Sequence, residues 1–104
     1  MRRGDVWWAD LPPPVRRRPV LLLSRDAMPA ARPEITVAYL TTIVRHATVE
    51  VFLDVSDGVP QPCVINLDSI NTIPKRLLHR LIGPLSAAKM DEVKAAILEA
   101  LDLK

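Results

Sequence analysis

The stretch Arg16-Arg17-Arg18-Pro19-Val20-Leu21-Leu22-Leu23-Ser24 places three positive charges directly before an apolar run. The run 20–24 predicts a strand that is covered on both faces. Guanidinium groups stay charged at physiological pH and form paired hydrogen bonds to phosphate oxygens, so the start of such a strand suits a phosphodiester. Arginines at a strand end more often only keep an apolar strand soluble, and the rest of the chain has to decide between the two interpretations.

Several other short extended segments accompany this strand. Residues 5–9 are aromatic and β-branched and are ended by three consecutive prolines, which cannot continue a ladder. Residues 28–33 form a proline-containing loop. Further strands are expected at 35–40, 49–54, 63–67 and 69–73, with a last extended piece at 81–83. The pattern predicts about six or seven short strands.

The C-terminal stretch changes period from strand to helix. Met90, Val93, Ile97 and Leu101 recur at helical spacing, so an amphipathic helix is expected with Ser86 as its N-cap after the break at Pro84. Residues 75–78 suit a single helical turn. Short, non-repeating strands followed by one long helix predict an α+β fold: a small, barrel-like antiparallel sheet with a C-terminal amphipathic helix.

The length of 104 residues predicts a single domain spanning 1–104. The longest uninterrupted apolar runs are four residues, whereas a membrane span needs about 20. No apolar region follows Arg2 and Arg3, so no secretory signal is recognised and a cytoplasmic location is expected. Cys63, His46 and His79 do not stand at metal-binding spacings, and neither a metal nor a cofactor is expected.

The net charge of +2 is unevenly distributed along the chain. Residues 1–32 carry seven arginines against three aspartates, a balance of +4, while residues 33–74 have a balance of −4. The last thirty residues return to +2. The basic N-terminal third is therefore the candidate region for binding an anionic partner.

Five segments follow one another along nearly the whole chain: Arg3-Gly4-Asp5-Val6-Trp7-Trp8-Ala9-Asp10-Leu11, Arg18-Pro19-Val20-Leu21-Leu22-Leu23-Ser24-Arg25-Asp26, Val37-Ala38-Tyr39-Leu40-Thr41-Thr42, Val64-Ile65-Asn66-Leu67-Asp68 and Ile82-Gly83-Pro84-Leu85. Together these segments resemble the MazF/PemK toxins. The resemblance implies the SH3-like barrel of the CcdB/PemK type. It also implies a homodimeric, sequence-specific, metal-independent endoribonuclease that cleaves single-stranded RNA and is neutralised by a MazE-like antitoxin.

In that family, the catalytic pair is the arginine of the Arg-Pro-Val segment and the Thr or Ser that ends the next long strand. The matching residues here are Arg18 and Thr41. RNA supplies its own nucleophile, the 2′-hydroxyl, so an enzyme without a metal needs chiefly to hold the attack in line and to stabilise charge on phosphorus. Arg18 suits the phosphate clamp, and Thr41 would orient the 2′-hydroxyl or a phosphate oxygen. The products would be a cyclic 2′,3′-phosphate and a 5′-hydroxyl.

Other residues are candidates for contacts with the RNA. Arg16, Arg17, Arg25 and Arg45 could bind flanking phosphates, and Thr42 is included although alternation on a regular strand would turn it away from the face of Thr41. The same alternation predicts that at least one of Trp7 and Trp8 is a core residue, and neither is placed in the site.

The segment Pro12-Pro13-Pro14-Val15-Arg16-Arg17 departs from the family pattern, because many relatives have a longer loop there with glycine and with acidic or amide residues. This loop should be short and stiff, and the identity of the general base is left open.

Two alternatives from other classes are considered. One is a CcdB-like gyrase poison, but that function depends on a C-terminal Trp-Gly-Ile, whereas this chain ends Leu101-Asp102-Leu103-Lys104. The other is a nucleic-acid-binding module without catalysis.

Overall fold

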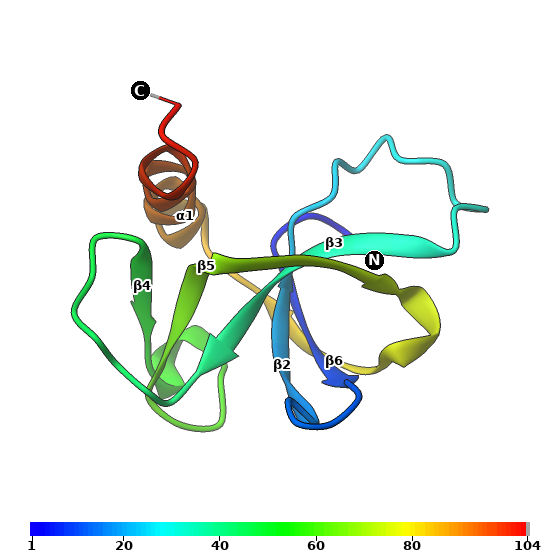
Figure 1. Cartoon of the computed structure of the whole chain (residues 1–104), viewed down its shortest axis with the longest axis horizontal. Helices are drawn as coiled ribbons and strands as arrows, with labels where there is room; N and C mark the ends of the chain where they lie inside the picture. Colours follow the sequence, from blue (N-terminus) through cyan, green and yellow to red (C-terminus); the bar gives the residue numbers. More distant parts are fainter. Residues whose placement is uncertain (104) are drawn as a thin grey trace.

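The computed structural model describes residues 1–103, and within them six antiparallel strands form one curled sheet (Figure 1). The strands are β1 (Asp5–Asp10), β2 (Arg17–Leu22), β3 (Glu34–Thr41), β4 (Glu50–Leu53), β5 (Cys63–Pro74) and β6 (Leu78–Pro84). Their order across the sheet is β4-β5-β3-β2-β1-β6, so β2 and β3 lie together in its middle.

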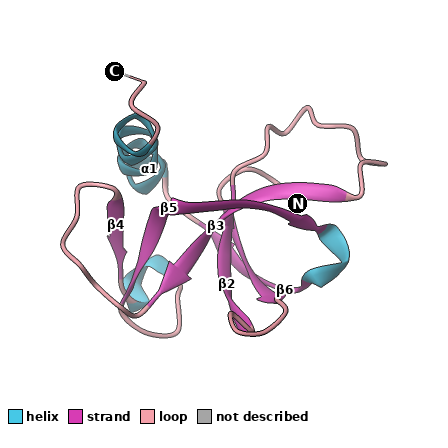
Figure 2. Ribbon diagram, in the orientation of Figure 1, coloured by secondary structure: helices cyan, strands magenta, loops and turns pink. Residues whose placement is uncertain are grey.

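One long helix, α1 (Ala87–Ala100), follows the last strand and packs beside β4 and β5 (Figure 2). The Ser86 hydroxyl oxygen accepts a hydrogen bond from the Lys89 N–H at 3.1 Å, as expected of an N-cap. Two short 3₁₀ turns, η1 (Val55–Asp57) and η2 (Lys75–Leu77), connect strands. The predicted N-cap, terminal helix and helical turn near 75–78 are confirmed.

Both faces of β2 are covered, as its uniformly apolar sequence predicts. Leu21 points into a cluster that includes Val93 and Ala96 of α1, whereas Val20 and Leu22 belong to a second cluster on the other side of the sheet. All three β2 side chains are fully buried. Because close packing covers both faces of β2, the middle of the sheet is rigid, and the residues at the ends of β2 are held in fixed positions.

Most strands differ from their predicted bounds by a residue at an end, and β6 is Leu78–Pro84 where only 81–83 was expected. Two further differences concern β2 and β5. β2 begins at Arg17 and not at Val20, because Arg17 and Arg18 pair with Asp10 and Ala9 of β1. The two strands predicted at 63–67 and 69–73 are one continuous strand, β5, which pairs with β3 on both sides of an irregularity. There the register passes from Ala38 opposite Ile70 to Tyr39 opposite Asn66, so residues 67–69 bulge out of the ladder.

The expected fold class is confirmed: an α+β chain in which a curled antiparallel half-barrel is followed by one C-terminal helix. Among the described residues, no helix has the length and apolar character that a membrane crossing requires.

Candidate functional site

The opening of the site lies where β2 and β3 separate. Their ladder pairs Leu22 with Val37, Leu21 with Ala38 and Val20 with Tyr39, and it goes no further. The Leu23 N–H donates to the Thr36 carbonyl at 2.9 Å. Every second residue of a strand points its backbone N–H and C=O toward the same neighbouring strand, so the backbone of Pro19, like that of Leu23, would face β3. Proline has no N–H to donate. The strands therefore part at Pro19, and the same register continued outward sets Arg18 opposite Thr41.

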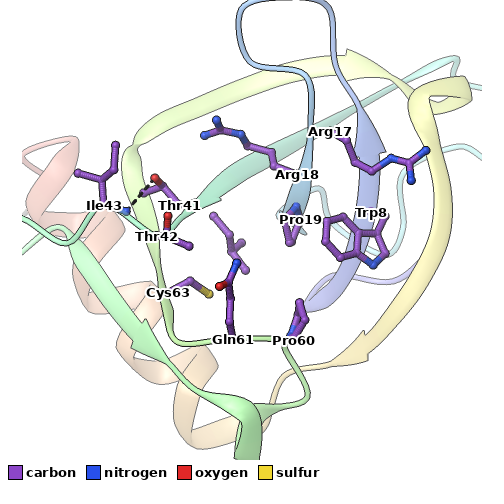
Figure 3. Close-up of a pocket in the computed structure, with 11 residues that line it drawn as sticks. Trp8, Arg17, Arg18, Pro19, Thr41, Thr42, Ile43, Pro60, Gln61 and Cys63 are labelled. Atoms are coloured by element: carbon purple, nitrogen blue, oxygen red, sulfur yellow. Dashed lines mark hydrogen bonds between the residues drawn. The ribbon is translucent and has the colours of Figure 1, made fainter.

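A cavity of about 380 Å³ occupies this opening (Figure 3). Figure 3 shows Thr41, Thr42 and Cys63 on one side of the opening, Trp8 on the other and Arg18 between them along the rim. The remaining lining residues are Arg17, Pro19, Leu40, Ile43, Pro60 and Gln61. The chain thus brings its first three strands, the loop after η1 and the start of β5 together at one site.

Arg18 is held at the rim with its charge uncompensated. Its guanidinium lies 6.0 Å from the centre of the Tyr39 ring, and its Nη2 donates to the Val15 carbonyl at the long distance of 3.5 Å. Within residues 1–103 no carboxylate forms an ion pair with it, and its Nε is buried without a hydrogen-bond partner. A buried donor without a partner costs free energy, so this guanidinium is prepared for an anionic ligand.

Thr41 is the last residue of β3, and its hydroxyl is oriented by the turn that follows. The Oγ1 atom accepts a hydrogen bond from the Ile43 N–H at 3.2 Å. That contact uses the oxygen as an acceptor and leaves the hydroxyl proton free to donate into the opening.

A second, smaller cavity of about 190 Å³ adjoins the same pair. It shares Arg18, Thr41 and Ile43 with the first cavity and is otherwise lined by Tyr39, Arg45, Asn66 and Ser69. The β5 bulge places Asn66 and Ser69 there, and the Asn66 Nδ2 donates to the Ser69 hydroxyl at 3.2 Å. Arg18 and Thr41 therefore lie at the junction of two cavities of different character.

The structure brings three of the other predicted residues to this junction. Arg17 lines the larger cavity but is paired with Asp10, with 2.9 Å between its Nε and the carboxylate oxygen. Arg45 lines the smaller cavity. Thr42 lines the larger cavity together with Thr41, so the expectation that it faces away is wrong; β3 has already ended at Thr41, and strand alternation no longer applies.

Two predicted arginines lie apart from the junction. Arg25 follows the end of β2 that is opposite to Arg18, and it lines a separate basic cavity with Arg2 and Arg3. Arg16 is exposed in the turn before β2, where its φ of 63° is in the left-handed region, and it lines neither of the two cavities at the junction.

Sequence reasoning missed Trp8, Gln61, Asn66 and Ser69. Alternation indicates that the two tryptophans point to opposite sides of β1, and Trp7 indeed packs on the core beside Val20 and Leu22. It gives no sign that the other ring, Trp8, would face the opening. Gln61 lies in an irregular loop and Asn66 and Ser69 flank a bulge, so no periodic pattern marks them.

Cys63 contributes an apolar wall and not a nucleophile. Burial, and secondarily the charge of Asp57, raises the pKa of its thiol. The thiol form therefore persists at neutral pH. Among residues 1–103 there is no group of three or more His, Cys, Asp or Glu side chains arranged to hold a metal ion.

The protein is thus a small curled antiparallel half-barrel whose central strands end at a site suited to an anion, with an arginine that has no carboxylate partner among the described residues and an oriented threonine hydroxyl. The comparisons with known proteins identify the family. The model of the PemK-like, MazF-like toxin of type II toxin-antitoxin systems matches residues 2–101. The chain therefore belongs to the PemK/MazF toxin family.

Individual relatives agree with this assignment. The chain is 36% identical over 101 residues to the probable endoribonuclease MazF5 of Mycobacterium tuberculosis, covering 96% of this chain and 92% of that protein. The structure of the M. tuberculosis toxin MazF-mt6 superposes with a TM-score of 0.88 at 37% identity, covering 96% of this chain and 98% of that one. An endoribonuclease in complex with its cognate antitoxin, from mycobacterial species, gives a TM-score of 0.88 at 29% identity, covering 100% and 97%. These relatives support the predicted endoribonuclease and not the gyrase poison.

Proposed function

We propose that this chain is a MazF-type endoribonuclease toxin that cleaves single-stranded RNA at the junction of the two cavities, with Arg18 and Thr41 as its catalytic pair. The relatives named as endoribonucleases support the reaction class. The observation that carries the residue assignment is that Arg18 and Thr41 line both cavities. A phosphodiester bound between them would have one neighbouring nucleotide on each side.

The chemistry follows from the groups that are present. Attack of the 2′-hydroxyl oxygen on phosphorus forms the 2′,3′-cyclic phosphate while the bond from phosphorus to the 5′-oxygen breaks. The added negative charge on the phosphoryl oxygens is stabilised by the unpaired Arg18 guanidinium. The Thr41 hydroxyl, fixed by the Ile43 N–H, donates to a phosphoryl oxygen and so helps to hold the attacking and leaving oxygens in line.

The lining of the two cavities supports catalysis by charge stabilisation and positioning. None of the described residues that line either cavity carries a carboxylate or an imidazole. The 2′-hydroxyl proton would pass to water, and the leaving 5′-oxygen would take its proton from water. The rate would then depend on the fixed positions of Arg18 and Thr41 more than on a titrating side chain.

We further propose that the toxin acts in the cytoplasm as a homodimer and is inhibited there by an acidic antitoxin segment. One of the similar structures is a complex with a cognate antitoxin. An acidic peptide would compete with RNA for the charge of Arg18. Exposed apolar side chains that a partner copy could cover are Ile43, Val44, Phe52 and Leu81.

The test is to incubate the purified protein with a long single-stranded RNA in excess EDTA and to map the cuts and their end groups. Discrete cuts with 5′-hydroxyl ends, absent for Arg18→Ala, are expected. Intact RNA in the presence of folded wild-type protein would refute the proposed activity. Cleavage by Arg18→Ala at the wild-type rate would refute only the residue assignment.

A further inference from the structure

The larger cavity has walls that suit a nucleobase better than a phosphate. Below the rim held by Arg18 and Thr41, its surface is formed by Trp8, Pro19, Leu40, Pro60 and Cys63. None of these side chains can neutralise an anion. Its volume of about 380 Å³ falls within the range of about 300–1,000 Å³ that is usual for small-ligand sites.

Trp8 presents an aromatic surface at this wall. It lies directly opposite Pro19 in the register of β1 and β2, and its ring stands across the opening from Thr41 and Thr42 (Figure 3). Trp8 is half-buried, in a strand that is paired on both sides, so its backbone position is fixed. Aromatic side chains of this kind are the usual platforms for unstacked RNA bases.

Gln61 supplies a hydrogen-bonding group in the same cavity. Its side chain is exposed, and within the described part of the chain its amide has no hydrogen-bond partner. A primary amide offers donors and an acceptor together, which matches the polar edge of a nucleobase. Besides Gln61, the polar groups lining the cavity are the two rim arginines, the two rim threonines and the thiol of Cys63.

We propose that the larger cavity is a nucleobase subsite, in which the base next to the cleaved phosphodiester stacks on Trp8 and is read by the Gln61 amide. The inference rests on the proposed RNA cleavage and extends it to substrate selection. The smaller polar cavity beyond Arg18 receives the nucleotide on the other side of the phosphate. The sequence preference of the enzyme then depends in part on residues that take no part in the chemical step.

The first experiment follows Trp8 directly. The chain has two tryptophans, so Trp7→Phe leaves Trp8 as the only indole fluorophore. Trp7 Nε1 is buried without a partner, so the exchange to phenylalanine removes an unsatisfied donor and should preserve the fold. The probe is an oligonucleotide that spans the mapped cleavage site and carries a 2′-deoxy group at the cleaved nucleotide. Saturable quenching of Trp8 is expected, whereas Trp8→Phe, which reports only Trp7, should show little change.

The second experiment separates selection from chemistry. Trp8→Ala should lower kcat/KM by about 5- to 150-fold, the loss that removing one base-stacking aromatic produces, mainly through KM, and Trp8→Phe should restore most of it. Gln61→Glu and Gln61→Ala should change the relative cleavage of substrates that differ only in the base adjacent to the cut, with little effect on fold stability.

The outcomes distinguish the subsite from the activity itself. If the wild type leaves RNA intact, the proposed function is refuted and the subsite with it. If the wild type cleaves but Trp8 is not quenched, or if Trp8→Ala has the kinetics of the wild type, the subsite alone is refuted. A loss for Gln61→Glu and Gln61→Ala that is equal for every adjacent base would also refute the assignment of Gln61 as a base-reading residue.

Discussion

Replacement of Arg18 by alanine should remove activity while leaving the protein folded, and the structure gives the size of both effects. The side chain contributes to stability through its contact with Tyr39 at 6.0 Å and one hydrogen bond of 3.5 Å. A cation–π contact at a partly exposed site is worth about 0.5–1 kcal/mol, and a hydrogen bond of that length adds little. Because the variant also removes the buried Nε that has no hydrogen-bond partner within residues 1–103, the expected loss is at most about 1 kcal/mol, a fall in Tm of no more than about 4–8 °C for a domain of this size.

The catalytic loss should be much larger. Removing one preorganised donor from a developing oxyanion typically costs about 100- to 1,000-fold in rate, about 2.7–4 kcal/mol. Because a domain with ordinary stability stays almost fully folded after losing about 1 kcal/mol, unfolding cannot account for such a decrease. The measurement is single-turnover cleavage of a labelled RNA, with Tm recorded for the same preparations.

The matched control is Arg32→Ala, which removes the same charge from an exposed loop position outside both cavities. Its cleavage rate should stay close to that of the wild type. A decrease of only a few-fold for Arg18→Ala, or the same decrease for both variants, would show that Arg18 acts through the general positive charge of the protein. The assignment of Arg18 to the phosphate would then be wrong.

Three further predictions concern other parts of the molecule. Thr41→Ala should lower kcat by about 100-fold or more with Thr41→Ser restoring most of it, whereas Thr42→Ala should change mainly KM; equal effects on kcat in a cleavage assay would contradict the assignment. Leu21→Ala should lower the free energy of unfolding by about 2–5 kcal/mol in urea titrations, because Leu21 is 0% exposed. The raised pKa of Cys63 means that its stabilising effect is complete below the ordinary thiol pKa of 9.0 and is lost as pH rises above it. The wild type should therefore lose more Tm than Cys63→Ala between about pH 7 and pH 10, and equal losses would show that folding does not raise the pKa of this thiol.

The elements of this fold could be predicted where burial imposes a simple period. The apolar run 20–24, the helical spacing from Met90 onward and the cap at Ser86 all depend on contacts that the sequence pattern records. The continuity of β5 could not be predicted, because a bulge inserts unpaired residues at 67–69 and these resemble a turn between two strands. The start of β2 at Arg17 could not be predicted either, because a charged residue in a polar stretch gives no strand pattern and only its pairing with Asp10 of β1 makes it part of the sheet.

The candidate site was only partly predictable for a related reason. Arg18 and Thr41 are 23 positions apart in the sequence, and only the resemblance to a family joined them before the sheet was known. Which other arginines lie near Arg18 depends on the end of β2 that each one is close to, and Arg25 follows the end that is far from Arg18. The alternation of side chains along β1 correctly predicted that the two tryptophans point to opposite faces of the sheet. It could not predict that Trp7 packs on the core while Trp8 lines the cavity.

Pro19 links the fold to the site, because its backbone accounts for the position of the opening. With an N–H at this position, the ladder between β2 and β3 could extend to Leu40, and the register would bring Arg18 directly against Thr41 as a closed cross-strand pair. The missing donor keeps the strand ends apart, while pairing with Trp8 of β1 holds β2 in place on its other side. The same residue thus lies between the two residues of the proposed catalytic pair and forms one wall of the proposed base subsite opposite Trp8. Pro19 therefore marks the position at which the ladder between β2 and β3 ends and the larger cavity begins.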